Sequence, residues 1–149
     1  MLTIHKILCP TDFSEHALAG LKYAVDLAGQ FGARICLVHV VPVIPPLPPD
    51  PNFAFEVPEY ARLLTADAEQ KLSELASQHV PNKLEPKMVV GHGDAGAEIV
   101  RVAEDERADL IVIATQGLTG LRHFVFGSVA EKVVRLAKCP VLSFRVGTA

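Results

Sequence analysis

The sequence predicts an α/β fold with a five-stranded, mostly parallel sheet, doubly wound so that helices cover both faces. Two observations carry this prediction. Short apolar runs rich in Val, Ile and Leu recur along the 149 residues, and segments whose apolar residues return every three or four positions separate them. Strands that alternate with helices in the order βαβαβαβαβ join through right-handed crossovers, which gives a parallel sheet between helices. The length favours one domain over residues 1–149.

Composition excludes several classes of protein. The net charge of −3 argues against a general nucleic-acid binder, which needs a basic surface. No apolar stretch is long enough to span a bilayer, and the start, MLTIHK, lacks the layout of a signal peptide, so we expect a cytoplasmic protein. Cys9, Cys36 and Cys139 lie in or beside apolar runs. We expect them to be free thiols, buried or half-buried, in a reducing compartment.

The first strand is expected over Ile4 to Cys9, and the helix after it begins with Ser14 as its N-cap. The inner face of this helix recurs at steps of three and four residues: Ala17, Leu18, Leu21, Ala24, Val25 and Ala28. Gly29 and Gly32 mark its end. The second strand, Ala33 to Val41, shows little alternation between apolar and polar residues. That pattern is typical of a strand covered on both faces.

Seven prolines crowd the segment from Pro42 to Pro58. Neither a helix interior nor a central strand tolerates that density, so we interpret the segment as an extended surface loop. It is either a stiff connection between strand and helix, which we favour, or a ligand for an aromatic groove on another protein.

The next helix is expected over Glu59 to His79, and its inner face consists of Leu64, Ala68, Leu72, Leu75 and Ala76. A strand follows at about Lys87 to Val90. Asp94 is placed to cap the third helix. That helix should bury Ile99, Val100 and Ala103 and expose Arg101, Glu104, Asp105 and Glu106.

The last third of the chain repeats the pattern. Asp109 to Ala114 is expected to form the fourth strand and Pro140 to Val146 the last one. The helix between them should bury Ala130, Val133, Val134 and Ala137.

A small-residue loop joins the fourth strand to this helix, and it has the chemistry of a phosphate site. Nine residues separate Gly117 from Gly127, and glycine lets a ligand approach the backbone closely. Gly127 and Ser128 open the helix, where free N–H groups and the dipole favour an anion. Arg122 in the loop can screen phosphate charge. The stretch is neither a Walker A loop nor a dinucleotide fingerprint, and glycines that serve only as turn residues remain the alternative.

The turn after the first strand can supply the other half of a site. In a doubly wound sheet, ligands bind outside the carboxyl ends of the strands where the strand order reverses. If strands one and four are neighbours, that point lies between Pro10-Thr11-Asp12 and Ala114 to Gly117. Asp12 can accept hydrogen bonds from a ribose hydroxyl or an exocyclic amine, or it can serve as a turn or cap residue. We expect His39 to be a packed, hydrogen-bonded histidine and His92 a solvated loop histidine.

Several of these segments resemble the universal stress proteins, and the match covers nearly the whole chain. They are the opening KILCPTDFSEHA, the run LVHVV, and the end ADLIVIATQGLTGLRHFVFGSVAEKVVRLAKCPVLSFR. ATP-binding members carry the pattern G-2x-G-9x-G-(S/T). Here it becomes Ala114-Thr115-Gln116-Gly117, nine residues, then Gly127-Ser128. The resemblance implies a Rossmann-like fold of the adenine nucleotide alpha hydrolase type.

The resemblance also implies a nucleotide site. It would contain Pro10, Thr11 and Asp12 at the adenosine end, Val40 with its backbone against adenine, Ile113 and Ala114 beside base and ribose, and Gly117, Gly127, Ser128 and Val129 around the phosphates. The chain departs from the pattern at Ala114, where the family has the first glycine of the motif. If that position needs a positive φ, alanine strains it by about 1 kcal/mol. If it needs only space, the methyl group narrows the pocket. Gln116 stands where many members have His.

Members of the family are commonly homodimers joined through the last strand, which here runs from Val141 to Val146 and would otherwise be an open edge. Our first hypothesis is a cytoplasmic stress-response protein that binds ATP or AMP as a homodimer and acts by binding; Mg²⁺ can accompany ATP. The second is an interaction dimer without nucleotide, in which the glycine loop is only structure. The third, slow ATP hydrolysis, ranks lowest, because the sequence offers no clear general base and no carboxylate pair for a metal. It identifies no protein partner.

Overall fold

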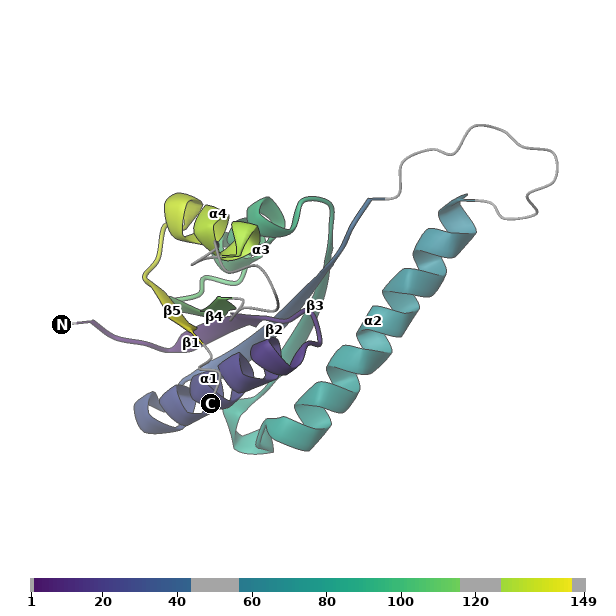
Figure 1. Ribbon diagram of the computed structural model, residues 1–149. Helices are drawn as coiled ribbons and strands as arrows, with labels where there is room; N and C mark the ends of the chain where they lie inside the picture. Colours follow the sequence, from purple (N-terminus) through teal and green to yellow (C-terminus); the bar gives the residue numbers. More distant parts are fainter. Residues whose placement is uncertain (1, 44–56, 116–126, 146–149) are drawn as a thin grey trace, which may run out of the picture.

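The computed structural model describes residues 2–43, 57–115 and 127–145 (Figure 1). They form one five-stranded sheet in the order β3-β2-β1-β4-β5, and every neighbouring pair of strands is parallel. The strands are β1 (Lys6–Pro10), β2 (Arg34–Val41), β3 (Lys87–His92), β4 (Leu110–Thr115) and β5 (Val141–Arg145). This confirms the predicted α/β sheet and places strands one and four side by side at its centre.

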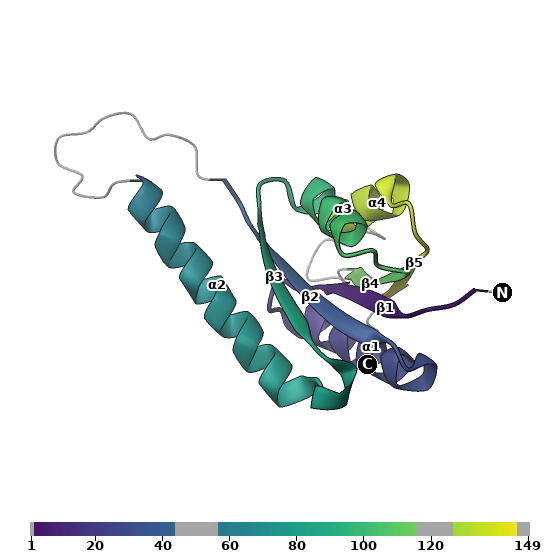
Figure 2. The same ribbon diagram turned by 180° about the vertical axis from the view of Figure 1, so that it is seen from behind.

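Four helices cover the sheet: α1 (Glu15–Phe31), α2 (Val57–His79), α3 (Ala95–Asp105) and α4 (Ser128–Leu136). A short 3₁₀ helix, η1 (Asn82–Leu84), precedes β3. The two views of the ribbon show α1 and α2 on one face and α3 and α4 on the other (Figures 1 and 2). The sheet is therefore doubly wound, as predicted.

Each face of the sheet has its own apolar core. Ile7 and Leu37 face α1 and α2, whereas their neighbours Leu8 and Val38 face α3 and α4. Because successive side chains of a strand point to opposite faces, both sets must be apolar when both faces are covered. This explains the missing alternation in the second strand.

The three cysteines fit this packing. Cys9 and Cys36 are buried, Cys139 is half-buried, and all three are free thiols, as expected. Cys9 and Cys36 belong to opposite cores. Burial is the main cause that raises the pKa of each of these two thiols to about 12. They are inert packing residues at neutral pH.

Some boundaries and orientations differ from the sequence-based expectations. β1 begins at Lys6 and includes Pro10, β2 begins at Arg34, β3 continues to His92, and α2 begins at Val57. Such differences of one or two residues are common at the ends of elements. Pro58 lies in the first turn of α2, where proline's missing N–H is harmless. Residues 44–56 of the expected loop, and Val146, lie outside the described residues.

The predictions for the inner faces of α3 and α4 were partly wrong. In α3, Val102 is buried and Val100 only half-buried. In α4, Val134 is 49% exposed, because the α3-facing side of this short helix is filled by Ala130 and Val133. No helix among the described residues has both the length and the apolarity to cross a bilayer.

Glu106 is the clearest correction, because it was expected to face water. It is the residue after α3, its side chain is only 14% exposed, and it pairs with two lysines from β1 and β3, the strands on either side of β2. Lys87 Nζ lies 2.7 Å from Glu106 Oε1, and Lys6 Nζ lies 3.3 Å from Oε2. The hydrogen bond from Lys87, and then that from Lys6, lower the pKa of Glu106 below its usual value against the opposing effect of burial.

We predict that Glu106→Gln lowers the free energy of unfolding at neutral pH by about 1 kcal/mol. Because its pKa is lowered, the contribution of Glu106 is complete above its unfolded pKa of about 4.3 and is lost as pH falls through the folded pKa. Urea unfolding of wild type and variant should therefore converge as pH falls to about 3. Glu104→Gln, at a more exposed pair, is the control and should change little. A Glu106→Gln difference that stays constant with pH would contradict this assignment.

Candidate functional site

The sheet opens between β1 and β4 because of Pro10. The ladder between β1 and β2 continues as far as Pro10 opposite Val38, but β1 and β4 pair at only two positions near their start. In a strand, the backbone N–H and C=O groups of every second residue point to the same neighbouring strand. The carbonyl oxygen of Lys6 accepts the N–H of Asp109, just before β4, so Lys6, Leu8 and Pro10 all face β4. Pro10 therefore faces β4 with a nitrogen that carries no proton. The crevice that results lies where the strand order reverses, the usual ligand position in such a sheet.

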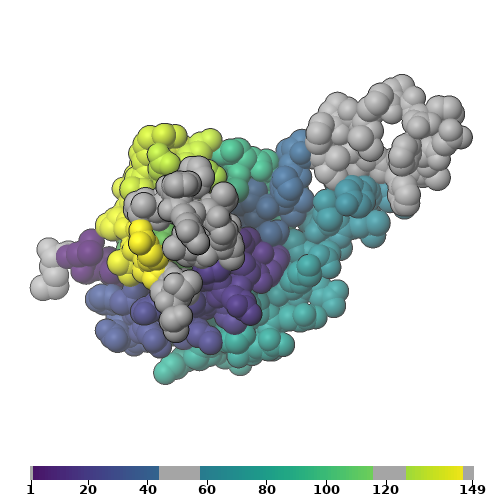
Figure 3. Space-filling view, in the orientation of Figure 1, coloured from purple at the N-terminus to yellow at the C-terminus, as the bar shows by residue number. Residues whose placement is uncertain are grey.

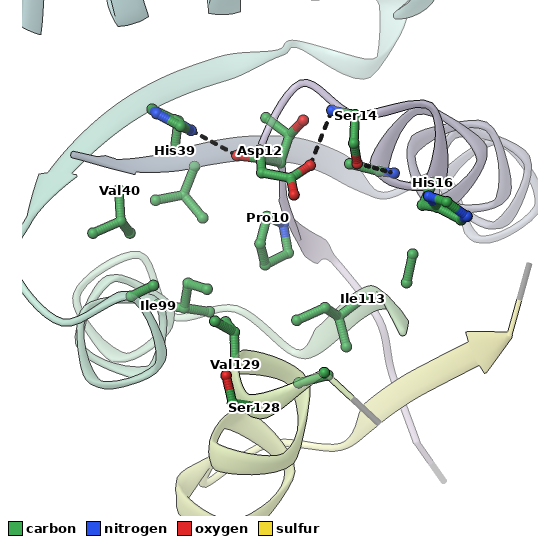
Figure 4. A pocket seen from close by; sticks show the side chains of 17 residues that line it. Pro10, Asp12, Ser14, His16, His39, Val40, Ile99, Ile113, Ser128 and Val129 are labelled. Atoms are coloured by element: carbon green, nitrogen blue, oxygen red, sulfur yellow. Dashed lines mark hydrogen bonds between the residues drawn. The ribbon is translucent and has the colours of Figure 1, made fainter. Parts of the chain in front are cut away.

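A cavity of about 200 Å³ occupies this crevice (Figure 4). It brings together these residues of the predicted site: Pro10, Thr11, Asp12, Val40, Ile113, Ala114, Gly127, Ser128 and Val129. The predicted residues Gly117 and Arg122 lie outside the described part of the chain. Sequence reasoning missed a second group of lining residues, which come from the starts of α1, α3 and α4 and from β2: Ser14, His16, Ala17, Val38, His39, Ala95, Ile99 and Ala130. Whether these residues bind a ligand stays a prediction.

Hydrogen bonds fix the turn that follows β1. Thr11 donates its N–H to Val38 O at 2.9 Å, and its Oγ1 accepts the N–H of Phe13 at 3.0 Å. Phe13 has a φ of 65°, which is unusual for a bulky residue. The N–H of Ser14 then donates to Asp12 Oδ1 at 2.9 Å, and Ser14 Oγ caps α1 by accepting from Ala17 N. The turn is therefore shaped in advance of any ligand.

Asp12 combines the two roles that the sequence left open for it. Its Oδ1 holds the turn through Ser14, which is the turn role. The carboxylate also lies at the edge of the cavity (Figure 4), and within the described ranges Oδ2 makes no hydrogen bond. One oxygen of Asp12 is thus structural and the other is available.

The structure also describes His39 and His92, the two histidines discussed in the sequence analysis. His39 Nδ1 lies 2.8 Å from the carbonyl oxygen of Thr11, so this nitrogen carries the proton and donates. Its ring packs on Phe13 with centroids 4.5 Å apart, as expected for a packed, hydrogen-bonded histidine. His92 was expected in a loop but ends β3, and its Nε2 lies 2.9 Å from Thr65 Oγ1. His92 does not line the cavity.

The backbone of Val40 presents a donor and an acceptor to the cavity. Two hydrogen bonds show which way the residues of β2 face. The carbonyl oxygen of Val38 accepts the N–H of Thr11 on the β1 side, whereas that of Val41 accepts the N–H of Gly93 on the β3 side. By alternation, the N–H and C=O of Val40 point toward β1. Since β1 ends at Pro10, they have no strand to pair with, and no hydrogen bond joins them to the rest of the described chain.

The start of α4 forms the opposite wall, and no side chain of the described residues caps it. Gly127 is its N-cap and makes no side-chain hydrogen bond, whereas Ser14 caps α1 and Asp94 caps α3. The first backbone bond of α4 is that of Glu131 N to Gly127 O, at 3.0 Å. The N–H groups before it have no acceptor within the helix and attract an anion, aided by the dipole.

Ala114, the departure from the glycine motif, is accommodated without backbone strain. It lies inside β4 and is not among the described residues with positive φ. Its methyl group faces α1, where a Cβ added to Gly20 would lie 3.4 Å from it. The first alternative, a strained alanine, is therefore excluded.

The cavity thus joins three kinds of surface. Ile99, Ile113 and Val129 give it apolar walls, Val40 gives a free donor and acceptor, and the start of α4 gives anion-binding N–H groups. No group of three His, Cys, Asp or Glu residues suited to a metal occurs in the described part of the chain. The surfaces suit a flat apolar ligand with polar edges and an anionic tail.

Comparisons with known proteins agree with this architecture. The sequence model of the universal stress protein family matches residues 3–145. Universal stress protein MJ0531 of Methanocaldococcus jannaschii is 37% identical over 139 residues, which span 92% of this chain and 79% of that protein. The solved structure of MJ0577 from the same organism superposes with a TM-score of 0.78 at 27% identity, over 99% of each chain. A universal stress protein of Archaeoglobus fulgidus in complex with dAMP has the same fold, with a TM-score of 0.60, 20% identity and coverage of 96% and 98%. The chain belongs to the universal stress protein family.

Proposed function

We propose that this protein is a cytoplasmic stress-response protein that binds an adenine nucleotide, ATP or AMP, in the cavity between β1 and β4. The observation that carries the proposal is the combination of surfaces around the cavity: an N–H and C=O at Val40 without a partner in the described chain, apolar walls, and a start of α4 that no described side chain caps. The dAMP bound by the Archaeoglobus fulgidus relative supports an adenine ligand for this fold.

Each part of an adenine nucleotide has a chemical counterpart in the cavity. Adenine carries a ring nitrogen acceptor beside an amino donor, which matches the N–H and C=O of Val40. Its faces suit Ile99 and Ile113, which line the cavity from α3 and β4. Asp12 Oδ2 would accept a ribose hydroxyl, and Ser128 with the N–H groups of α4 would hold phosphate. Gly117 and Arg122 remain part of the proposed phosphate end.

The proposal favours binding over catalysis. Asp12 Oδ1 is committed to Ser14, and His39 Nδ1 to Thr11, so neither group is free to act as a general base at that atom. Mg²⁺ would be held by phosphate oxygens and water rather than by a set of carboxylates. Nucleotide occupancy would act by changing the surface around the start of α4.

We predict that the purified protein releases ATP or AMP on acid denaturation and binds it in titration calorimetry, and that Gly127→Val reduces the affinity at least about tenfold. Gly127 has φ −63° and ψ 147°, which valine adopts readily, so its side chain would act by filling the space that phosphate needs.

Gly29→Val is the control for this substitution, because a Cβ at Gly29 meets nothing within 4 Å. It should leave binding unchanged. Absence of nucleotide, together with no heat from ATP or AMP, would reject the proposal in favour of an interaction dimer without ligand.

We predict that Ala114→Gly changes nucleotide affinity by less than about twofold, because the methyl group of Ala114 packs toward Gly20 of α1, although Ala114 also lines the cavity. It should lower stability by about 0.5–1 kcal/mol, the usual cost of glycine within a strand. Calorimetry and urea unfolding measure the two effects separately. A large gain in affinity would show instead that the methyl group narrows the pocket.

We further propose a homodimer joined through β5. Among the described residues β5 pairs only with β4, so its outer edge is open. Apolar side chains flank this edge, since Leu142 is 41% exposed on β5 and Tyr23 packs on Phe144 from α1. In the space-filling view the yellow end of the chain reaches the surface between α1 and α4 (Figure 3). An unprotected edge with apolar neighbours favours pairing with a second copy.

We predict that Leu142→Lys converts the dimer to a monomer, because lysine on an edge strand opposes strand pairing. Sedimentation velocity or light scattering measures the mass directly. Met88→Lys is the matched control: Met88 is also 41% exposed and lies on β3, the opposite edge strand. If both variants stay dimeric, or if only Met88→Lys dissociates, β5 is not the interface.

A further inference from the structure

An ion pair joins the starts of the two helices that form one side of the cavity. Lys132, in the second turn of α4, places its Nζ 2.7 Å from Oδ2 of Asp94, the N-cap of α3. The same Asp94 oxygen accepts the N–H of Ala97. A single carboxylate therefore caps α3 and holds α4.

The aliphatic part of the Lys132 side chain packs against α3 at Gly96. A Cβ at Gly96 would lie 2.8 to 2.9 Å from three carbons of the Lys132 side chain, closer than real contacts allow. The missing side chain of Gly96 thus lets Lys132 cross the first turn of α3 and reach Asp94. The ion pair therefore needs all three residues: Lys132 and Asp94 for the charges, and Gly96 for the space between them.

Both joined helix starts line the cavity. Ala95 and Ile99 contribute from α3, and Val129 and Ala130 contribute from α4. The start of α4 has no side-chain cap of its own, so its position depends on contacts made with other elements. Lys132 supplies such a contact within one turn of the free N–H groups.

We propose that Lys132 is a positioning residue for the ligand, which through Asp94 fixes the separation of the α3 and α4 starts and the direction of the free N–H groups of α4. This inference rests on the proposed nucleotide site. It states that Lys132 raises ligand affinity although its ammonium group pairs with Asp94 and does not contact phosphate.

A direct attraction between Lys132 and phosphate is the competing account, and Asp94 separates the two. Asn caps helices about as well as Asp, so Asp94→Asn retains the cap of α3 and removes the charge that holds Lys132. Loss of positioning would weaken nucleotide binding. A lysine released toward phosphate would strengthen it.

The chain also contains a matched control at the other end of the same helices. Lys138 Nζ, just after α4, lies 3.0 Å from Glu104 Oε1 in α3. Lys138→Met and Lys132→Met each remove one positive charge and one ion pair between α3 and α4. Only the Lys132–Asp94 pair lies beside residues that line the cavity, because Asp94 directly precedes Ala95 and Lys132 follows Ala130 by two positions.

The test is titration of the full-length protein with ATP and with adenosine. Lys132→Met and Asp94→Asn are each expected to weaken ATP binding about fivefold, the double variant no more than either alone, and Lys138→Met less than about twofold. Lys132→Arg should restore most of the affinity. Tighter ATP binding by Asp94→Asn, or equal losses in the two Met variants, would overturn the inference.

A second measurement needs no ligand. Hydrogen exchange of the Glu131 N–H, the first backbone bond of α4, should be about fivefold faster in Lys132→Met than in wild type or Lys138→Met. Unchanged exchange in Lys132→Met overturns the inference even if nucleotide binds. Wild type that binds no nucleotide while the exchange result holds rejects the proposed function and retains the role of Lys132 in holding α4.

Discussion

The missing N–H of Pro10 is the constraint on which the rest of the site depends. Without that donor, one hydrogen bond of the ladder to β4 cannot form, and the pairing of β1 with β4 ends at Leu8 and Ile111. The chain then turns toward β2, where Thr11 takes the Val38 carbonyl. One consequence is the crevice itself. The other is that Val40, two residues further along β2, has a backbone donor and acceptor without a partner in residues 2–43, 57–115 and 127–145.

The parallel sheet supplies the second half of the site by geometry alone. Every helix that follows a strand starts near the carboxyl edge of the sheet, so the positive ends of α1, α3 and α4 lie around one crevice. Side chains decide which of these ends is available. Ser14 and Asp94 occupy the first N–H groups of α1 and α3, whereas no side chain among the described residues occupies those of α4. An anion is therefore directed to α4, although three dipoles point the same way.

The sequence predicts what depends on local pattern. Periodicity located the strands and helices, and the alternation of elements located the switch point, because both follow from near neighbours in the chain. Contacts between distant segments were not predictable in this way. The sequence predicts that Glu106 faces solvent, but in the fold β1 and β3 bring two lysines next to it. Lys132 reads as a solvated lysine until α3 offers Asp94 across 38 residues. Val40 was found only by resemblance to a family, since its free backbone depends on where the neighbouring strand ends.

Gly20 and Ala114 show why a motif is better understood as a packing problem than as a set of letters. Glycine inside a helix costs about 1 kcal/mol relative to alanine, yet at Gly20 it lets α1 lie close to β4 and β5. A Cβ there would approach Phe144 Cζ to 3.1 Å and the Ala114 methyl group to 3.4 Å. Ala114 thus adds a methyl group on β4 where the family motif has glycine, and Gly20 leaves space for that methyl group on α1. The backbone of Ala114 needs no special conformation, so the constraint at this position is the space between helix and strand, and the two residues meet it together.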